Sequence, residues 1–418
     1  MQSAIREVDV RNVPLLKRLR SLFASLHGHG ARRDGAGNRT LHYDDYCILI
    51  LLALFSPVEL SLRRIIQISD VKKVKRKLGV NRTSLGSFSE SSHLFDPALL
   101  EPIIAELAGQ LPSVANDPRL KDMRQIVTLV DGTLLRALPR ITEAMWLSTR
   151  TGTRHHAFRL HTQFELDRHV PTRLELTDGR NSGASDEKAV LRESLQKDRC
   201  YVMDRGYAQF KLFNDINAAA SSYVCRVRDN SVYKIKEQRP LKRADEQAGV
   251  ISDQIVDLGQ KQQGRVRPDH ALRLVCIRIS EHEKRSNRKG NTGAGPSDGV
   301  LRIATHLIDV PAEIIALLYR HRYTIELFFR FFKQTLGCSH LLSDHPNGIR
   351  IQTYCAVIAS ILIQLHTGRR ADKATQFMIG LYLSGVADLE ELLAHVNRAD
   401  NRGVKLRAKD TLWKKLGV

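Results

Sequence analysis

The sequence predicts an α/β protein in which a mixed β-sheet is flanked by helices, with an all-helical domain before it. Three observations support this fold class. Residues 1 to about 110 show helical periodicity, residues 125 to 220 follow the order strand, strand, strand, helix, strand, helix, and helical periodicity returns after residue 305. Between 221 and 304, short strands alternate with polar, basic loops, so we expect a β-rich insertion there.

The composition indicates a partner with negative charge. The 418 residues can hold two or three domains, and 65 Lys and Arg against 45 Asp and Glu give a formal net charge of +20. A field of that sign attracts polyanions, of which nucleic acid is the commonest and a membrane surface the main competitor. No apolar stretch reaches the roughly 18 residues needed to span a bilayer, so we expect no membrane-spanning segment.

The cysteines exclude two common kinds of small scaffold. All six lie far apart without a CxxC pair, and the sixteen histidines show no metal-ligand spacing, which leaves zinc ribbons and disulfide frameworks unsupported. The N-terminus also lacks the apolar run of a signal peptide. We therefore expect a reduced, cytoplasmic protein whose cysteines pack as small apolar residues.

Residues 1–115 are predicted to form a helical DNA-binding domain. An amphipathic helix at 13–26 precedes a Gly-rich link at 27–37 and an apolar helix at 46–55. Short helices follow at 62–67 and 71–78, and a third begins near residue 82. The second short helix carries five basic residues: Lys72, Lys73, Lys75, Arg76 and Lys77. This pattern fits a helix-turn-helix reader of DNA, and it equally fits a small basic bundle whose lysines contact phosphates alone.

Two apolar strands in the next region each end in an aspartate. The run at 126–130 leads into Asp131-Gly132-Thr133, and the run at 200–203 leads into Asp204-Arg205-Gly206-Tyr207. Between them, alternating residues at 157–166 and 172–177 predict an antiparallel hairpin, and 185–195 reads as a helix with Asp186 near its start. A single strand-end aspartate often serves only to form a turn, but two of them favour a site where the sheet edge meets solvent.

The region after residue 305 carries the third acid. Asp309 and Pro311 predict the start of one long helix that runs to Gly337. One stripe of this helix is wholly polar, and a neighbouring stripe is wholly apolar and should face a core. The polar stripe contains Tyr319, Arg322, Glu326, Arg330 and Lys333, and the apolar stripe contains Leu318, Ile325, Phe329, Phe332 and Leu336.

A single carboxylate among three cations suits a ligand that carries both metal ions and phosphates, although an ordinary solvated face is the alternative. Asp131, Asp204 and Glu326 can meet only through the fold. If they do, they can hold two divalent ions about 3.5–4 Å apart for in-line phosphoryl transfer. Magnesium is expected because the ligands are hard oxygens, with Arg322 and Lys333 gripping the flanking phosphates.

These motifs resemble a known family. The spacing Tyr-x2-Arg-x3-Glu-x6-Lys, met by Tyr319, Arg322, Glu326 and Lys333, is similar to the signature of the DDE-class insertion-sequence transposases named for their Tyr-Arg-Glu-Lys (YREK) motif. The contexts of Asp131 and Asp204 resemble that family's first and second catalytic aspartates. The resemblance covers about 125–365.

The resemblance implies a ribonuclease-H-like catalytic domain of the retroviral-integrase superfamily, formed by 120–220 and 305–370 and split by the insertion at 221–304. It also implies that Asp131, Asp204 and Glu326 are catalytic metal ligands for two Mg²⁺, for which Mn²⁺ can substitute. By matching positions, Tyr319, Arg322 and Lys333 would contact double-stranded DNA at the inverted-repeat ends and the target. Arg330 is expected to contact DNA too, because it lies on the same polar stripe of the helix. A homodimer on DNA in a bacterial, nucleoid-associated setting is implied too.

Family members are similar in nicking the transposon end with water, after which the freed 3′ hydroxyl forms a hairpin that is reopened before attack on target DNA. A tryptophan in the insertion can stabilise that hairpin, but Trp146 and Trp413 both lie outside this insertion, which leaves Tyr233 as the stacking candidate. The segment 371–418, with a helix at 381–396 and a basic tail at 402–415, could serve dimer or DNA contacts. The alternative function is a transposase-derived DNA-binding protein that has lost catalysis or strand transfer.

Overall fold

The computed structural model describes residues 20–29, 40–55, 61–113, 117–136, 146–148, 154–259, 266–278, 299–338, 341–368, 370–384, 386–388 and 390–395. The first half of the helix expected at 13–26, nearly all of the basic loop at 283–299 and the tail at 402–415 lie outside these ranges.

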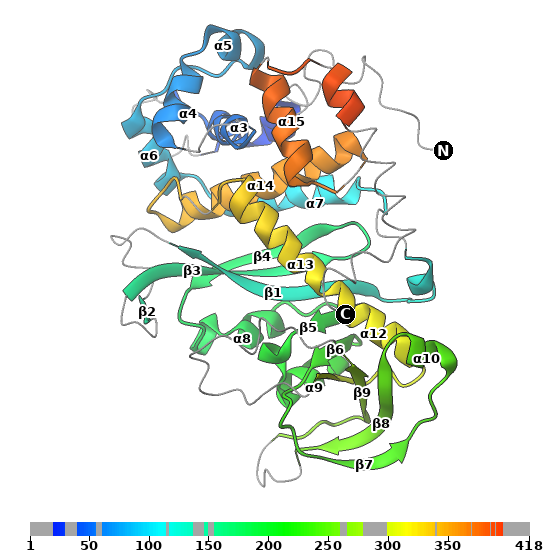
Figure 1. Cartoon of the computed structure of the whole chain (residues 1–418). Helices are drawn as coiled ribbons and strands as arrows, with labels where there is room; N and C mark the ends of the chain where they lie inside the picture. Colours follow the sequence, from blue (N-terminus) through cyan, green and yellow to red (C-terminus); the bar gives the residue numbers. More distant parts are fainter. Residues whose placement is uncertain are drawn as a thin grey trace.

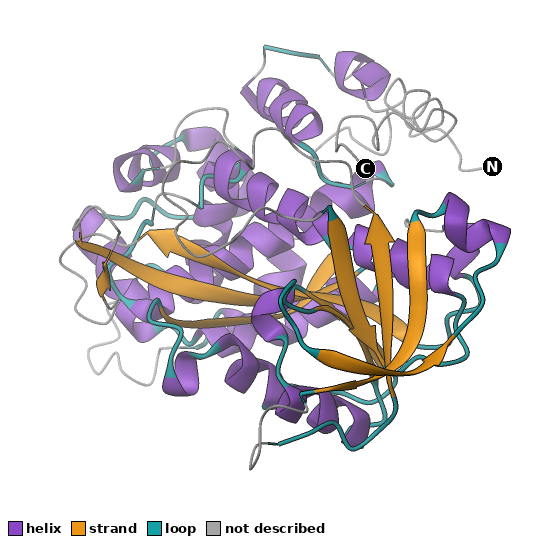
Figure 2. Ribbon diagram, turned by 60° about the horizontal axis from the view of Figure 1, so that its bottom comes forward, coloured by secondary structure: helices purple, strands orange, loops and turns teal. Residues whose placement is uncertain are grey.

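One mixed sheet of ten strands organises the described chain (Figures 1 and 2). At its centre, β1 (Ile126–Arg136) is antiparallel to β3 (Arg154–Glu165) and parallel to β5 (Arg199–Met203). On one side, β4 (Val170–Asp178) and the short β2 (Trp146–Ser148) pair with β3. On the other side, β6 (Ser222–Arg226) runs parallel to β5.

The segment 221–304 extends this sheet. After β6 come β10 (Val300–Thr305), β9 (Leu272–Arg278), β8 (Val250–Leu258) and β7 (Tyr233–Gln238), all antiparallel to their neighbours. The boundary at 221 thus falls at a strand of the central sheet. Strands β7 and β8 were not expected, because β7 is almost wholly exposed and polar and has no apolar period to detect.

The predicted hairpin is confirmed as β3 and β4. Its apolar face, which includes Phe158, Leu160 and Phe164, is buried in the main core. The opposite face of β3 is buried as well, since α8 (Glu187–Arg192) covers it and Gln163 Nε2 donates to Ser194 Oγ at 2.7 Å.

Helices cover both faces of the sheet. On one face, α8 and α9 (Phe210–Ala218) enclose a smaller core with the inward side chains of β5, β6 and β9. On the other lie α12 (Ala312–His321), α13 (Tyr323–Arg330), α14 (Pro346–Thr367) and the N-terminal helices (Figure 1). Further helices among the described residues include α3 (Tyr43–Leu54), α4 (Leu62–Ser69), α5 (Lys72–Leu78), α6 (Leu85–Leu94), α7 (Glu101–Gly109), α10 (Arg243–Gln247) and α15 (Lys373–Ser384).

Helix α14 is the central helix of the main core. Its residues pack on α3, α6 and α7, and the same hydrophobic cluster continues into β1, β3 and β4. We expected no segment that could cross a membrane, but Pro346–Leu365 has the length and a mean hydropathy of 1.4 that such a segment needs. Because 89% of this window is buried inside the fold, α14 is accounted for as a core helix.

The long helix predicted up to Gly337 is divided. The helical region is interrupted at Arg322, between α12 and α13. Its final segment, Phe331–Thr335, is π-helical. The expected apolar stripe is confirmed, since all five of its members are buried: Leu318, Ile325, Phe329, Phe332 and Leu336. A π-helical turn holds an extra residue, so Lys333 is rotated from the position that a regular helix would give it.

All six cysteines are buried and free, as expected for a protein whose cysteines serve as small apolar residues.

Candidate active site

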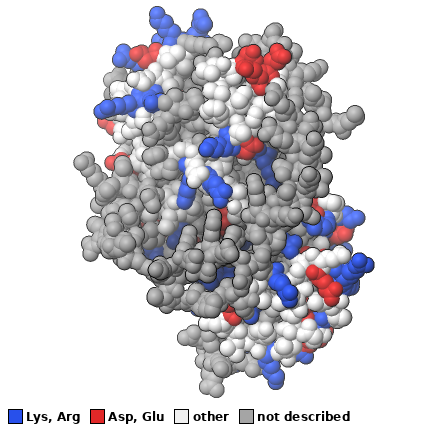
Figure 3. Space-filling view, viewed as in Figure 1, with Lys and Arg blue, Asp and Glu red and all other residues white. Residues whose placement is uncertain are grey.

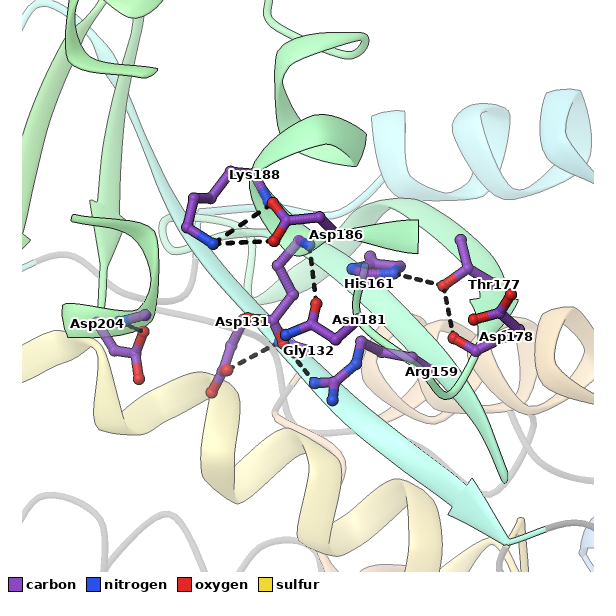
Figure 4. Close-up of polar contacts among 12 residues, drawn as sticks. Asp131, Gly132, Arg159, His161, Thr177, Asp178, Asn181, Asp186, Lys188 and Asp204 are labelled. Atoms are coloured by element: carbon purple, nitrogen blue, oxygen red, sulfur yellow. Dashed lines mark hydrogen bonds and ion pairs between the residues drawn. The ribbon is translucent and has the colours of Figure 1, made fainter. Parts of the chain in front are cut away.

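The strand register brings the two aspartates together. Val130 of β1 pairs with Met203 of the parallel strand β5, so the next residues along the two strands are Asp131 and Asp204. Neighbouring strands lie about 4.8 Å apart. Asp131 does not end its strand as expected, because β1 continues beside β3 to Arg136 while β5 stops at Met203. Figure 4 shows both carboxylates pointing to one side, toward the ribbon of α12 and α13.

Local hydrogen bonds fix the orientation of both aspartates. Asp131 Oδ1 accepts from the backbone N–H of Gly132 at 2.8 Å. Asp204 caps the short 3-10 helix Arg205–Tyr207, and its Oδ1 accepts from the N–H of Gly206 at 2.7 Å. Such backbone contacts limit the orientations that a carboxylate can adopt.

Glu326 joins this pair through Arg322. The Arg322 guanidinium donates to Glu326 Oε1 and, at 3.4 Å, to Asp131 Oδ2. The side chains of Arg322 and Asp131 are 18% and 21% exposed, so this contact is largely shielded from water. One cation therefore bridges a carboxylate of the sheet and a carboxylate of the helix.

The charges of Asp204 and Glu326 both act on Asp131. The pKa of Asp131 is raised to about 7, chiefly by burial and further by the charges of Asp204 and Glu326, while Arg322 and the Gly132 N–H oppose the rise. Burial works against the charge of Arg322, yet Tyr319, Glu326 and Asp131 raise its pKa above the ordinary value. The site is thus a carboxylate cluster that needs positive charge.

Tyr319 lies at the same place. Burial raises the pKa of its phenol, and the charges of both Arg322 and Asp204 act on it. Arg330 is exposed one turn beyond Glu326, where its Nη2 donates to Tyr323 Oη at 3.3 Å, and Lys333 is half-buried on the π-helical turn.

The basic residues of the N-terminal region lie elsewhere. Helix α5 contains all five of the predicted basic positions, and the side chains of Lys72, Lys75 and Arg76 are exposed. Figure 3 shows Lys and Arg side chains projecting from the edge of the molecule where α5 lies in Figure 1, far from the sheet that carries the aspartates. Tyr233 begins β7, the last strand of the sheet, and is partly buried against the smaller core.

Sequence reasoning missed a fourth acid, Glu187, and its partner Arg159. Glu187 is the first residue of α8 and forms an ion pair with Arg159 of β3. Its pKa is raised, first by burial and then by the charge of Asp204, while Arg159 lowers it. The start of this helix was predicted, but an acid in a first turn is ordinary helix-start chemistry and gave no sign of a site.

The donor set of this cluster fits a divalent metal. Three carboxylates supply only hard oxygens, which are the ligands that a divalent ion such as Mg²⁺ prefers. Within the part of the chain that the structure describes, no three metal-ligating side chains lie close enough together to form a finished site. The Arg322 guanidinium stands between two of the three acids.

Comparisons with known proteins place this site in a family. Residues 122–362 match the family described as "Transposase DDE domain". Over 264 residues the chain is 27% identical to "Putative transposase y4zB" of Sinorhizobium fredii, an alignment that covers 63% of this chain and 67% of that protein.

Two further similarities were found. The chain is 27% identical over 213 residues to "Probable transposase for insertion sequence element IS5377" of Geobacillus stearothermophilus, and spans 48% of that relative's length and 49% of its own. A piggyBac transposase synaptic complex with hairpin DNA aligns with a TM-score of 0.46 and 10% identity, over 95% of this chain and 87% of that one. The family match extends over more than half of the chain and includes Asp131, Asp204 and Glu326, so this protein belongs to the DDE transposases.

Proposed function

We propose that the protein is a DNA transposase that binds the inverted-repeat ends of an insertion sequence and catalyses metal-dependent cleavage and strand transfer. The observation that carries this proposal is that Asp131 and Asp204 lie at neighbouring positions of two parallel strands, while Arg322 links Asp131 to Glu326, although the three acids are far apart in sequence. Phosphoryl transfer needs positioned charge more than covalent chemistry from the protein, and this cluster supplies it.

The strand arrangement supports a ribonuclease-H-like catalytic domain. Five strands, in the order β4-β3-β1-β5-β6, form an antiparallel trio followed by two strands parallel to β1. Asp131 lies on β1, the central strand of this set, and Asp204 directly follows β5 beside it, where side chains from the covering helices can reach both. We assign 120–220 and 305–370, together with β6, to this domain and the rest of 221–304 to an insertion that extends its sheet.

Asp131, Asp204 and Glu326 would hold the metals, for which we propose two Mg²⁺ with Mn²⁺ as a substitute. When bound, such a pair supplies an activated oxygen nucleophile and stabilises the leaving oxygen. Arg322 would exchange its carboxylate partners for a DNA phosphate, because a guanidinium binds phosphate and carboxylate oxygens through the same fork of donors.

The remaining residues of the Tyr-Arg-Glu-Lys motif would position DNA. Tyr319 lies near Asp204, so its hydroxyl can contact the phosphate beside the cleaved bond. Arg330 is about 6 Å further along the helix than Glu326, at a rise of 1.5 Å per residue. Together with Lys333 it would extend the row of basic side chains that begins at Arg322. Helix α5 would bind the phosphates of the transposon end at a second place.

A cleavage assay tests the proposal. The protein is incubated with a labelled inverted-repeat duplex and Mg²⁺ or Mn²⁺, beside Asp204→Asn and Glu326→Gln. Both variants should lose nicking completely and retain end binding, because a metal ligand adds little to phosphate affinity. The matched control is Glu237→Gln, the same chemical change on exposed β7, which should cut like the parent.

Two results would contradict the assignment. Loss of end binding in Glu326→Gln, to the same degree as loss of nicking, would remove Glu326 from its role as a metal ligand. Binding without cutting by the parent would favour the other candidate, a DNA-binding protein derived from a transposase. A homodimer on DNA is tested in the same experiment by the mass of the complex in light scattering.

A further inference from the structure

Glu187 and Arg159 form an ion pair between the helix α8 and the strand β3. Their side chains are 13% and 15% exposed. The backbone of Glu187 is held from two sides, since its N–H donates to Asn181 Oδ1 at 3.0 Å and Asp186 caps the same helix through the N–H groups of Lys188 and Ala189 (Figure 4). The Glu187 carboxylate is therefore held at both ends, by the hydrogen-bonded backbone of α8 and by the Arg159 guanidinium.

Two glycines show where that carboxylate lies. A Cβ on Gly132 would lie 2.8 Å from Glu187 Oε1, and a Cβ on Gly206 would lie 3.7 Å from Glu187 Oε2. Gly132 directly follows Asp131, and Gly206 is two residues after Asp204. One carboxylate thus lies beside both of the backbone segments that carry the aspartates, close to the point where β5 ends and β1 continues.

A fourth negative charge at this position is energetically unfavourable. Asp204 repels it, and Arg159 provides the compensation. Replacing a buried ion pair by apolar residues is often neutral or stabilising, so stability alone does not explain why charges stand here. Contact with both aspartate segments gives the pair another role, which is to set the distance between them.

We infer that Glu187, held by Arg159, is a positioning residue that fixes the spacing of Asp131 and Asp204 and thereby the affinity of the site for divalent metal. The inference rests on the proposed function, because it takes the two aspartates to be metal ligands. Residues that support metal ligands from outside typically change metal affinity by about 10- to 100-fold when they are replaced.

The test is Glu187→Gln, with Glu193→Gln as its matched control. Glu193 follows the same helix and is exposed. Metal binding is measured without DNA, as the rise of the melting temperature with Mg²⁺ or Mn²⁺ concentration, and cleavage is measured over the same concentrations. Glu187→Gln should need about 10- to 100-fold more metal in both measurements and reach nearly parental cleavage at saturation. Glu193→Gln should match the parent.

A second variant covers the case in which Glu187→Gln folds poorly. Gly132→Ala keeps every charge but places a methyl group 2.8 Å from Glu187 Oε1, so the carboxylate must move. It should also raise the metal requirement. In the double variant Glu187→Gln with Gly132→Ala, the two effects should be clearly less than additive, because both act on the same contact.

The outcomes separate this inference from the proposed function. Parental metal dependence in Glu187→Gln and in Gly132→Ala would overturn the inference while leaving the transposase proposal intact. In another outcome, metal raises the melting temperature of the parent and does so less in both variants, but the parent does not cleave DNA. That outcome would uphold the positioning role of Glu187 and refute the proposed transposase activity. A folded parent without any metal response would overturn both.

Discussion

Charge on Asp131 should destabilise the metal-free protein, and Asp131→Asn removes that charge without changing the size of the side chain. The pKa of this carboxyl rises from 3.8 to about 7 on folding. A raised pKa means that the folded protein holds a proton that the unfolded chain releases. Stability contributed by the neutral carboxyl is therefore complete below about pH 4 and lost as the pH rises through 7.

The size of the effect follows from the two pKa values. One pKa unit corresponds to about 1.4 kcal/mol, so the rise from 3.8 to about 7 makes charged Asp131 unfavourable by about 4 kcal/mol above pH 8. The amide of Asp131→Asn cannot ionise, but its oxygen can still accept from the Gly132 N–H. In EDTA the variant should thus exceed the parent by about 4 kcal/mol at pH 8 and by far less at pH 5.

Unfolding of the parent and of Asp131→Asn in guanidinium chloride, at pH 5 and pH 8 in EDTA, measures this difference in stability. The comparison requires that both proteins have the same dependence of unfolding free energy on denaturant concentration. Asp178→Asn is a control of opposite sign. Despite some burial, hydrogen bonds from Arg180 and Ser185 lower the pKa of Asp178, so this substitution should reduce stability by the same amount at both pH values. An Asp131→Asn protein that is no more stable than the parent at pH 8, or is equally stabilised at pH 5, would refute the reasoning.

Two further substitutions test the frame around the site. Arg273→Met should cost about 3 kcal/mol in chemical unfolding, because Arg273 donates two hydrogen bonds of 2.7 and 2.8 Å to the buried Asp253, which would be left with a longer ion pair of 3.8 Å to Arg239. Arg278→Met on the exposed end of the same strand should change stability by less than about 0.5 kcal/mol, and equal losses would contradict the account. Gly348→Ala should lower the melting temperature, at a cost of about 1–3 kcal/mol, because its Cβ would lie 2.4 Å from Ser343, whereas Gly109→Ala meets no atom within 4 Å and should be neutral or slightly stabilising.

The sequence predicted the parts of the site better than their arrangement. Continuous apolar runs predicted β5 and the first half of β1, and apolar periodicity predicted the buried face of the catalytic helix. That Asp131 and Asp204 are next to each other depends on the parallel register of β1 and β5. This register is decided by tertiary packing, which no local pattern encodes.

The misses have physical causes as well. The turn at Arg322 coincides with its contacts to Asp131 and Glu326, the first of which comes from the sheet and is invisible to helical periodicity. Strand β7 was missed because it lies at the edge of the sheet with both faces exposed. Glu187 was missed because its importance comes from two distant glycines, whose missing side chains leave the room that it occupies.

Helix α14 joins the N-terminal helices and the central strands of the sheet in one hydrophobic core. Helices α3, α6 and α7 cover one side of α14, which is apolar and long enough to span a membrane. A fragment that begins after residue 115 would lack these three helices and would expose that side of α14 to water. Such a fragment should be made as aggregates or recovered with lipid. Truncation therefore cannot separate the proposed end recognition from the proposed chemistry, and point substitutions are needed to test the two separately.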